Sequence, residues 1–169
     1  MEVQHLFNIG DKIVYPVQGV GVIDLIEERE FKGKMQNFYK IHLISNSLKV
    51  TLPLNRVKDS NIRLVSDTST VDKIFDNISS FASSAKNTTY ENSKERITEN
   101  TLKIKSGTLK DYMEVLFDLS HVKKEHTLNS SETQMLNNAR KLVIDEISLV
   151  KDITNNEAAD MLDNSLKLA

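Results

Sequence analysis

The sequence predicts an α+β protein with two domains: a small β-barrel over residues 1–67, then a compact all-α domain of four to five helices over residues 68–169. Two observations predict this division. Both prolines and four of the five glycines lie before residue 68, and turn-forming residues at this density favour short strands joined by tight turns. Beyond residue 68 the apolar residues recur at helical spacing, and Gly107 is the only glycine.

Apolar and β-branched residues of the first domain gather in four runs, which are typical of strands. The runs cover residues 12–15, 20–31, 38–44 and 48–54. Gly33 fits a hairpin turn after the second run, because glycine readily takes a positive φ. Pro53 in the last run indicates a strand end or a sheet edge. We therefore expect four or five strands in a small closed or nearly closed barrel.

Apolar residues of the second domain follow helical spacing in five segments. The segments cover residues 71–82, 91–105, 109–119, 128–150 and 154–166. The second segment is the weakest, because Ile97 and Ile104 are its main apolar residues. Thr108 lies three residues before Asp111, and Thr154 three residues before Glu157, a spacing that predicts helix N-termini.

The motifs exclude most enzyme classes. The sequence contains no glycine-rich phosphate loop, no zinc-protease motif and no nucleophile elbow. Without cysteine it has no disulfide and no thiolate metal site. Gly19 and Gly21 form a G-x-G in a strand region, which favours a turn or packing role, and the spacing of His121 and His126 favours solvated surface side chains. We therefore predict a binding module that is not an enzyme, with no cofactor, metal or small-molecule substrate.

Charge and hydropathy limit the partners. The formal net charge of −2 argues against a protein that coats nucleic acid with a basic surface. The N-terminus lacks a cationic segment followed by an apolar stretch, and no apolar run approaches the roughly 18 residues of a membrane-spanning helix. We therefore expect a cytoplasmic monomer with no membrane partner.

One basic segment interrupts the acidic second domain. Residues 94–110 contain five basic residues against Glu95 and Glu99, a local net charge of 5 − 2 = +3. The five are Lys94, Arg96, Lys103, Lys105 and Lys110. A helix that ends in such a stretch can lie along a phosphate backbone. The alternative is an ordinary solvated helix end, where cations are favourable, and charge alone leaves both interpretations open.

Two segments carry long sequence patterns. Residues 7–21, FNIGDKIVYPVQGVG, fit F-x-x-G-D-x-V-V-Y-P-x-x-G-x-G with one isoleucine-for-valine exchange, and residues 128–140, LNSSETQMLNNAR, fit L-S-x-x-E-x-x-M-L-x-x-A-R with one exchange. With these segments the chain resembles the CarD/CdnL family of bacterial transcription regulators over nearly its whole length. Further matches are Phe31-Lys-Gly33, the strand at Tyr39, residues 48–53, and Ser106-Gly107 before a helix. The transcription-repair coupling factor shares the first pattern, but this chain has no helicase segments.

The resemblance implies a function that composition and residue spacing alone do not predict. The first domain would be a Tudor-like barrel that binds the β subunit of RNA polymerase. The second would contact promoter DNA at the upstream edge of the transcription bubble and stabilise the open complex without catalysis. The family's polymerase contacts fall on Arg29 and on Thr51, where the family has arginine; Lys49 lies two residues away and can substitute. An edge strand of the barrel is expected to pair with a polymerase strand.

The departures from the family concern DNA. Many members insert a tryptophan into the minor groove as a wedge, ahead of an arginine pair. Counted back from Ser106-Gly107, the tryptophan position falls on Ser93, and the arginine pair on Glu95 and Arg96. A family lysine falls on Thr98, and the nearest aromatic residue is Tyr90, a candidate substitute for the wedge.

Two hypotheses follow from these patterns. In the first, the helical domain contacts DNA weakly and without sequence preference, through the five basic residues of the 94–110 segment together with Ser93 and Tyr90. In the second, the helical domain has lost DNA contact, and the protein is an adaptor between proteins of the transcription machinery. The absent tryptophan and the acidic balance favour the second hypothesis, whereas the basic segment favours the first.

Overall fold

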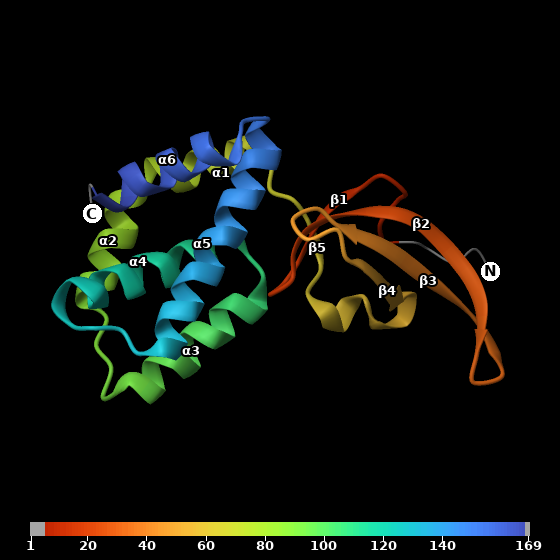
Figure 1. The fold of residues 1–169 in the computed structure, drawn as a ribbon, viewed down its shortest axis with the longest axis horizontal. Helices are drawn as coiled ribbons and strands as arrows, with labels where there is room; N and C mark the ends of the chain where they lie inside the picture. Colours follow the sequence, from red (N-terminus) through yellow and green to blue (C-terminus); the bar gives the residue numbers. More distant parts are fainter. Residues whose placement is uncertain (1–5, 168–169) are drawn as a thin grey trace. The chain divides into compact units, whose positions relative to one another are not determined.

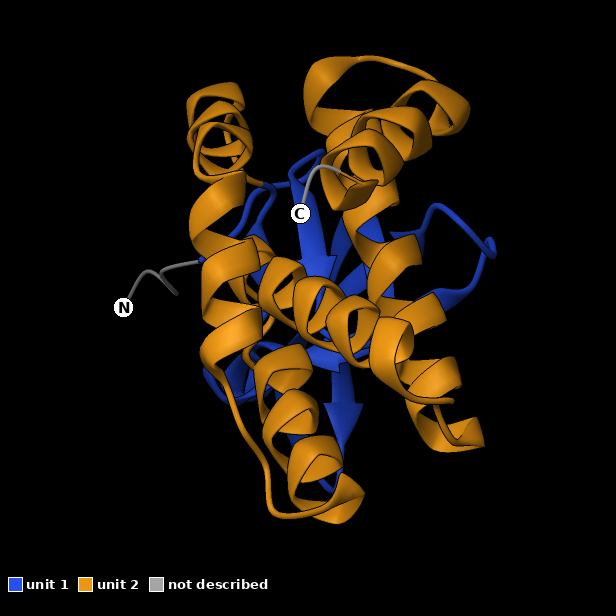
Figure 2. Cartoon of the chain, turned by 90° about the vertical axis from the view of Figure 1, so that its left-hand side faces the viewer, with its two compact units in different colours: residues 1–65 blue, residues 66–169 orange. Residues whose placement is uncertain are grey.

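The computed structural model describes residues 6–167 and confirms the α+β class, with an antiparallel sheet followed by helices (Figure 1). The chain divides into two compact units, residues 1–65 and residues 66–169 (Figure 2). Within the described residues, no helix is long and apolar enough to cross a membrane.

Unit 1 is a five-stranded antiparallel sheet with the order β4-β3-β2-β1-β5. The strands are β1 (Lys12–Tyr15), β2 (Gly19–Phe31), β3 (Lys34–Leu43), β4 (Lys49–Pro53) and β5 (Arg63–Leu64), with short 3-10 helices η1 (Leu54–Arg56) and η2 (Lys58–Ser60) after β4. The four predicted runs are β1 to β4. Strand β5 has no comparable signal in the sequence, because two residues are too short for a periodic pattern.

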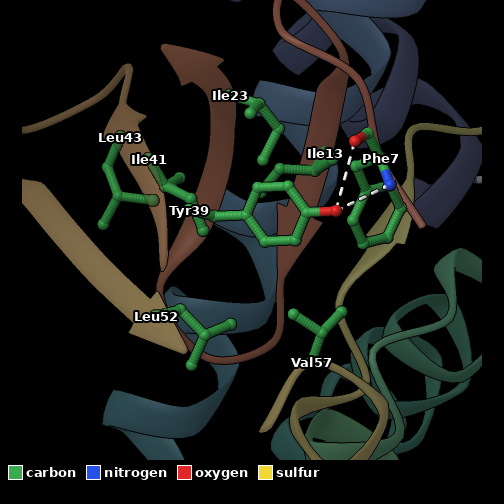
Figure 3. Packing of buried hydrophobic residues seen from close by; sticks show 8 residues of the cluster. All are labelled: Phe7, Ile13, Ile23, Tyr39, Ile41, Leu43, Leu52 and Val57. Atoms are coloured by element: carbon green, nitrogen blue, oxygen red, sulfur yellow. Dashed lines mark hydrogen bonds between the residues drawn. The ribbon is translucent and has the colours of Figure 1, made fainter. Parts of the chain in front are cut away.

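The sheet wraps around one apolar core, in which Tyr39 is the central aromatic side chain (Figure 3). Its ring is 1% exposed and packs edge-on against Phe7, with the ring centroids 6.1 Å apart. The Tyr39 hydroxyl accepts a hydrogen bond from the Phe7 N–H at 3.0 Å and donates one to the Phe7 carbonyl at 3.2 Å. A single buried hydroxyl therefore holds the segment that leads into β1.

Gly21 has the packing role predicted for the G-x-G segment. It lies in β2 opposite Leu43 of β3. A Cβ atom at this position would lie 2.9 Å from the His42 carbonyl oxygen and 3.0 Å from a methyl group of Ile41. The two strands can approach this closely only because residue 21 has no side chain.

The described part of unit 2, residues 66–167, contains six helices, one more than the upper limit predicted. They are α1 (Thr68–Asp76), α2 (Ile78–Asn87), α3 (Ser93–Ser106), α4 (Leu109–Glu125), α5 (Ser130–Lys151) and α6 (Asn155–Lys167). The predicted segment 71–82 is split at Asn77, which leaves helical geometry with φ −105° and ψ 22°. Its side-chain amide donates to the Lys73 carbonyl at 2.7 Å. The apolar spacing continues across Asn77, so the pattern alone does not show the break.

Helix α4 is the central helix of unit 2 and packs against α2, α3 and α5. Met113, Val115, Leu116 and Leu119 of α4 are fully buried. The start of α4 is fixed by Thr108, whose hydroxyl accepts from the Asp111 N–H at 3.1 Å, as predicted. The N-terminal end of α5 has a capping box between Asn129 and Glu132.

Candidate functional site

The three residues predicted to contact polymerase lie on the same face of the sheet in unit 1. Residues directly opposite each other in neighbouring strands share a face. Thr51 lies opposite Lys40, and Lys40 lies opposite Leu25 of β2. Arg29 follows Leu25 by four residues and Lys49 precedes Thr51 by two, so both side chains are on this face as well. We call it the outer face, because the core lies on the other side of the sheet.

The outer face combines one arginine with apolar and aromatic side chains. The Arg29 guanidinium lies over the Phe38 ring, 4.5 Å from its centroid, an attractive cation–π geometry. Phe31 packs edge-on against Phe38 at 6.2 Å. Phe31 and Leu25 are 44% and 42% exposed. The arginine is therefore held in place by aromatic packing, on a patch suited to a protein partner.

The sequence-based prediction did not include Phe31 or Phe38 in this surface. The sequence contains a signal for Phe31, because Phe31 follows Arg29 by two residues in a strand and therefore points to the same side of β2. Phe38 is opposite Glu27 in the neighbouring strand, which places it on the same face. That pairing depends on the bulge between Ile23 and Leu25, and no local pattern shows it.

Strand β4 is an edge of the sheet with unused backbone groups. The Leu43 N–H donates to the Leu48 carbonyl at 2.8 Å, one position beyond the His42–Lys49 pair. Antiparallel bonding alternates along a strand, so the N–H and C=O groups of Lys49 and Thr51 point away from β3. These groups form a short row that a further strand can use.

The five basic residues of the 94–110 segment do not form one surface. Arg96 turns into unit 2, where its Nε and Nη2 atoms donate to Glu132 Oε1 at 2.6 and 2.5 Å. The Glu132 side chain is 2% exposed and that of Arg96 is 15% exposed. Glu132 Oε2 also accepts from the Asn129 N–H at 3.2 Å. Arg96 therefore joins α3 to the beginning of α5.

The four lysines divide into two pairs. Lys103 and Lys110 share the carboxylate of Glu114, at 3.3 and 3.9 Å. Lys94 and Lys105 are both exposed, and they are eleven residues apart, about three helical turns, on one side of α3. Lys94 and Lys105 thus lie on the outward side of this helix, and the phosphate contact of the segment stays a prediction.

Neither Ser93 nor Tyr90 has the geometry of a wedge in this structure. Ser93 is the exposed first residue of α3, after the N-cap Asn92. Tyr90 is half-buried, and its hydroxyl donates to Asp118 Oδ2 at 3.2 Å. Burial raises the pKa of Tyr90 well above its usual value, and the nearby Asp118 charge raises that pKa further. Asp118, 4% exposed, also accepts from the Asn100 amide at 2.7 Å, so Tyr90 belongs to an internal polar network.

Within the part of the chain that the structure describes, no group of three or more histidine, aspartate and glutamate side chains is placed to hold a metal ion. Each unit has one candidate binding surface. In unit 1 it is the aromatic patch beside the open strand edge, and in unit 2 it is the exposed side of helix α3 with its lysines. Such features are typical of proteins that bind other macromolecules.

Comparison with known proteins gives the family. The CarD-like/TRCF RID domain model matches residues 7–66, and the CarD C-terminal domain model matches residues 77–163. The chain belongs to the CarD family of transcription factors, which confirms the resemblance found in the sequence. A Bacillus subtilis (strain 168) protein named "Putative transcription factor YdeB" is 38% identical over 152 residues, which is 90% of this chain and 97% of that protein. A solved structure described as "CdnLNt from Myxoccoccus xanthus" is 40% identical, covering 34% of this chain and 82% of that chain, with a TM-score of 0.29.

Proposed function

We propose that this protein binds the β subunit of RNA polymerase through unit 1 and stabilises the open promoter complex, without catalysis, through weak, sequence-independent DNA contact by unit 2. It would act in the cytoplasm as a monomer. The main observation in support is the Arg29–Phe38 stack on the same face as Lys49 and Thr51 of the open edge strand β4. The CarD-like/TRCF RID match over residues 7–66 supports the same assignment.

Strand addition is the proposed mode of polymerase binding. The outward N–H and C=O groups of β4 would give main-chain hydrogen bonds to a strand of the β subunit. Arg29 and Phe31, on the outer face, would then give specificity, because they contact side chains of that strand or its neighbours. Lys49 supplies a positive charge at the edge, two residues from Thr51.

Charge reversal at Arg29 tests the polymerase contact. We expect the Arg29→Glu protein to lose at least about tenfold in affinity for RNA polymerase, because a central arginine packed on an aromatic ring is typical of a binding hot spot. Co-purification and a binding titration with the isolated β subunit measure this loss. Lys58→Glu is the matched control, since Lys58 is an exposed residue of η2 rather than of the outer face. Equal binding by the Arg29→Glu and wild-type proteins would refute the assignment.

The open edge can be tested by removing one backbone donor. Proline at position 51 lacks the outward N–H but leaves the bonds of Val50 and Leu52 to β3 intact, because edge strands accept proline where the N–H faces solvent. We expect Thr51→Pro to weaken polymerase binding while Thr51→Ala, which keeps the N–H, has a smaller effect. Thermal unfolding of both variants checks that unit 1 stays folded. Polymerase affinity that is the same in both variants would exclude pairing through this edge.

The DNA contact is proposed for the outward side of α3. Each phosphate contact contributes roughly −0.9 to the slope of log K against log salt. We expect Lys94→Glu combined with Lys105→Glu to reduce that slope by about 1.8 for the protein–polymerase–promoter complex and to slow promoter opening. Tethering by polymerase raises the local DNA concentration, so the isolated protein is expected to bind DNA weakly. Tight, sequence-specific binding by the free protein would contradict this proposal.

The adaptor hypothesis is favoured by one structural observation. Arg96 pairs with Glu132, and Lys103 and Lys110 both approach Glu114, so three of the five basic residues of the 94–110 segment have a carboxylate partner inside unit 2. Promoter opening that is unchanged by the Lys94→Glu and Lys105→Glu pair, together with intact polymerase binding, would support the adaptor and remove the DNA contact.

A further inference from the structure

Unit 2 contains a cleft that the proposed function does not use. It lies among α1, α2 and the first turns of α4, and its volume is about 560 Å³. This volume lies in the range of sites for small ligands, roughly 300–1,000 Å³. The residues that matter for the argument are Lys73, Ser80, Phe81, Ser84 and Lys110.

The cleft has more positive than negative charge. Lys73 and Lys110 come from different helices and both line it. Lys73 forms no ion pair with any described residue. Hydrogen bonds from Thr70 lower the pKa of Asp67, whose carboxylate caps α1 by accepting from the Thr70 N–H, and the Lys73 charge lowers that pKa further. Glu114 is the acid in the lining. Its carboxylate lies 3.3 Å from the Lys103 Nζ atom and 3.9 Å from the Lys110 Nζ atom.

The remaining lining includes one aromatic wall and two serine hydroxyl groups. Phe81 is fixed by a nearly parallel stack on Phe117, with the centroids 5.7 Å apart and the planes inclined by 26°. Ser80 and Ser84 lie four residues apart on α2, so both hydroxyls face the same side of that helix. Serine hydroxyls both donate and accept hydrogen bonds.

We propose that this cleft binds a small phosphorylated ligand with a flat ring, of the nucleotide class. Lys73 and Lys110 would hold the phosphate groups by charge-assisted hydrogen bonds. Ser80 and Ser84 would bind polar groups of the ligand, and the ring would lie along the Phe81 wall. A few convergent polar groups beside an apolar wall are the usual composition of a small-molecule site.

Titration of the full-length protein with ATP, by calorimetry, tests the proposal. We expect ATP to bind, inorganic pyrophosphate to bind more weakly, and adenosine to bind weakest, because each lacks one part of the recognised structure. Lys73→Glu should lower ATP affinity by about tenfold or more. The matched control Lys86→Glu, an exposed lysine of α2 outside the cleft, should bind ATP as wild type does.

A second variant shows whether a loss of ATP binding comes from the cleft itself or from misfolding of the first variant. Ser84→Phe fills the cleft without changing its charge, and Ser84 is exposed, so the fold should tolerate it. Lys73→Glu and Ser84→Phe should each lower ATP affinity by about tenfold or more while keeping the wild-type helical circular dichroism. The proposal is overturned if wild-type protein does not bind ATP, if both variants bind ATP normally, or if Lys73→Glu weakens binding of duplex DNA but not of ATP. The last result would assign Lys73 to a DNA backbone.

Discussion

Replacing Arg96 with methionine is expected to lower the free energy of unfolding of unit 2 by about 3–5 kcal/mol. The substitution leaves the Glu132 carboxylate, 2% exposed, without its cationic partner. A buried charge without a partner keeps its full desolvation cost. Urea unfolding followed by circular dichroism at the helical minimum measures the effect, because every α-helix among residues 6–167 belongs to unit 2.

An exposed ion pair of the same unit gives the matched control. Arg140 binds Asp163 at 2.9 Å, but the two side chains are 40% and 41% exposed. Arg140→Met should therefore cost less than about 1 kcal/mol. The double variant R96M/E132Q should recover part of the loss, since it no longer buries a lone charge. Similar losses for Arg96→Met and Arg140→Met would contradict the internal role assigned to Arg96.

Replacing Tyr39 with alanine should destabilise unit 1 by about 3–5 kcal/mol. The ring is 1% exposed, and its removal leaves a large cavity in the apolar core that Tyr39 shares with Phe7, Ile13 and Ile41. It also leaves the N–H and C=O of Phe7 without the hydroxyl that satisfies both. Amide resonances of β2 and β3, followed through a urea titration by NMR, report this unit separately.

The Tyr39→Phe variant separates the contribution of ring packing from that of the hydroxyl hydrogen bonds. It keeps the ring and removes the hydroxyl, so its cost should be about 1–3 kcal/mol, the cost of unsatisfied buried polar groups. Faster hydrogen exchange at the Phe7 amide is the specific sign of the lost bond. A Tyr39→Phe protein as unstable as Tyr39→Ala would mean that the hydroxyl, rather than ring packing, dominates.

Much of the fold could be predicted because its signals are local. Residues close together in the sequence predict the strands β1 to β4 and the helix caps at Thr108 and Thr154, and the structure contains all of them. The break at Asn77 was missed because apolar spacing continues through it, while the interruption comes from a side-chain amide bound to the Lys73 carbonyl. Such competition between side chain and backbone has no periodic signature.

The candidate site was less predictable because its residues act through distant partners. The charge pattern predicts a phosphate contact for Arg96, yet in the structure Arg96 pairs with Glu132, which is 36 residues away. One signal was available: Arg96, Asn100 and Ile104 follow at intervals of four, which places Arg96 on the buried side of α3. On the outer face, the register between β2 and β3 brings Phe38 to Arg29, and strand register is not determined by either strand alone.

The open edge of β4 also has a consequence for self-association. A row of unused backbone groups accepts any strand of suitable length, including the same strand of another copy, which is the first step of aggregation. This edge is only five residues long, carries Lys49 at one end and ends in Pro53, which has no N–H to offer. In an antiparallel pair of such edges, Lys49 of each copy would lie opposite Pro53 of the other, so a charge and a missing donor would stand at both ends of a short ladder. We therefore expect the protein to stay dispersed at high concentration, and Lys49→Val to make it aggregate.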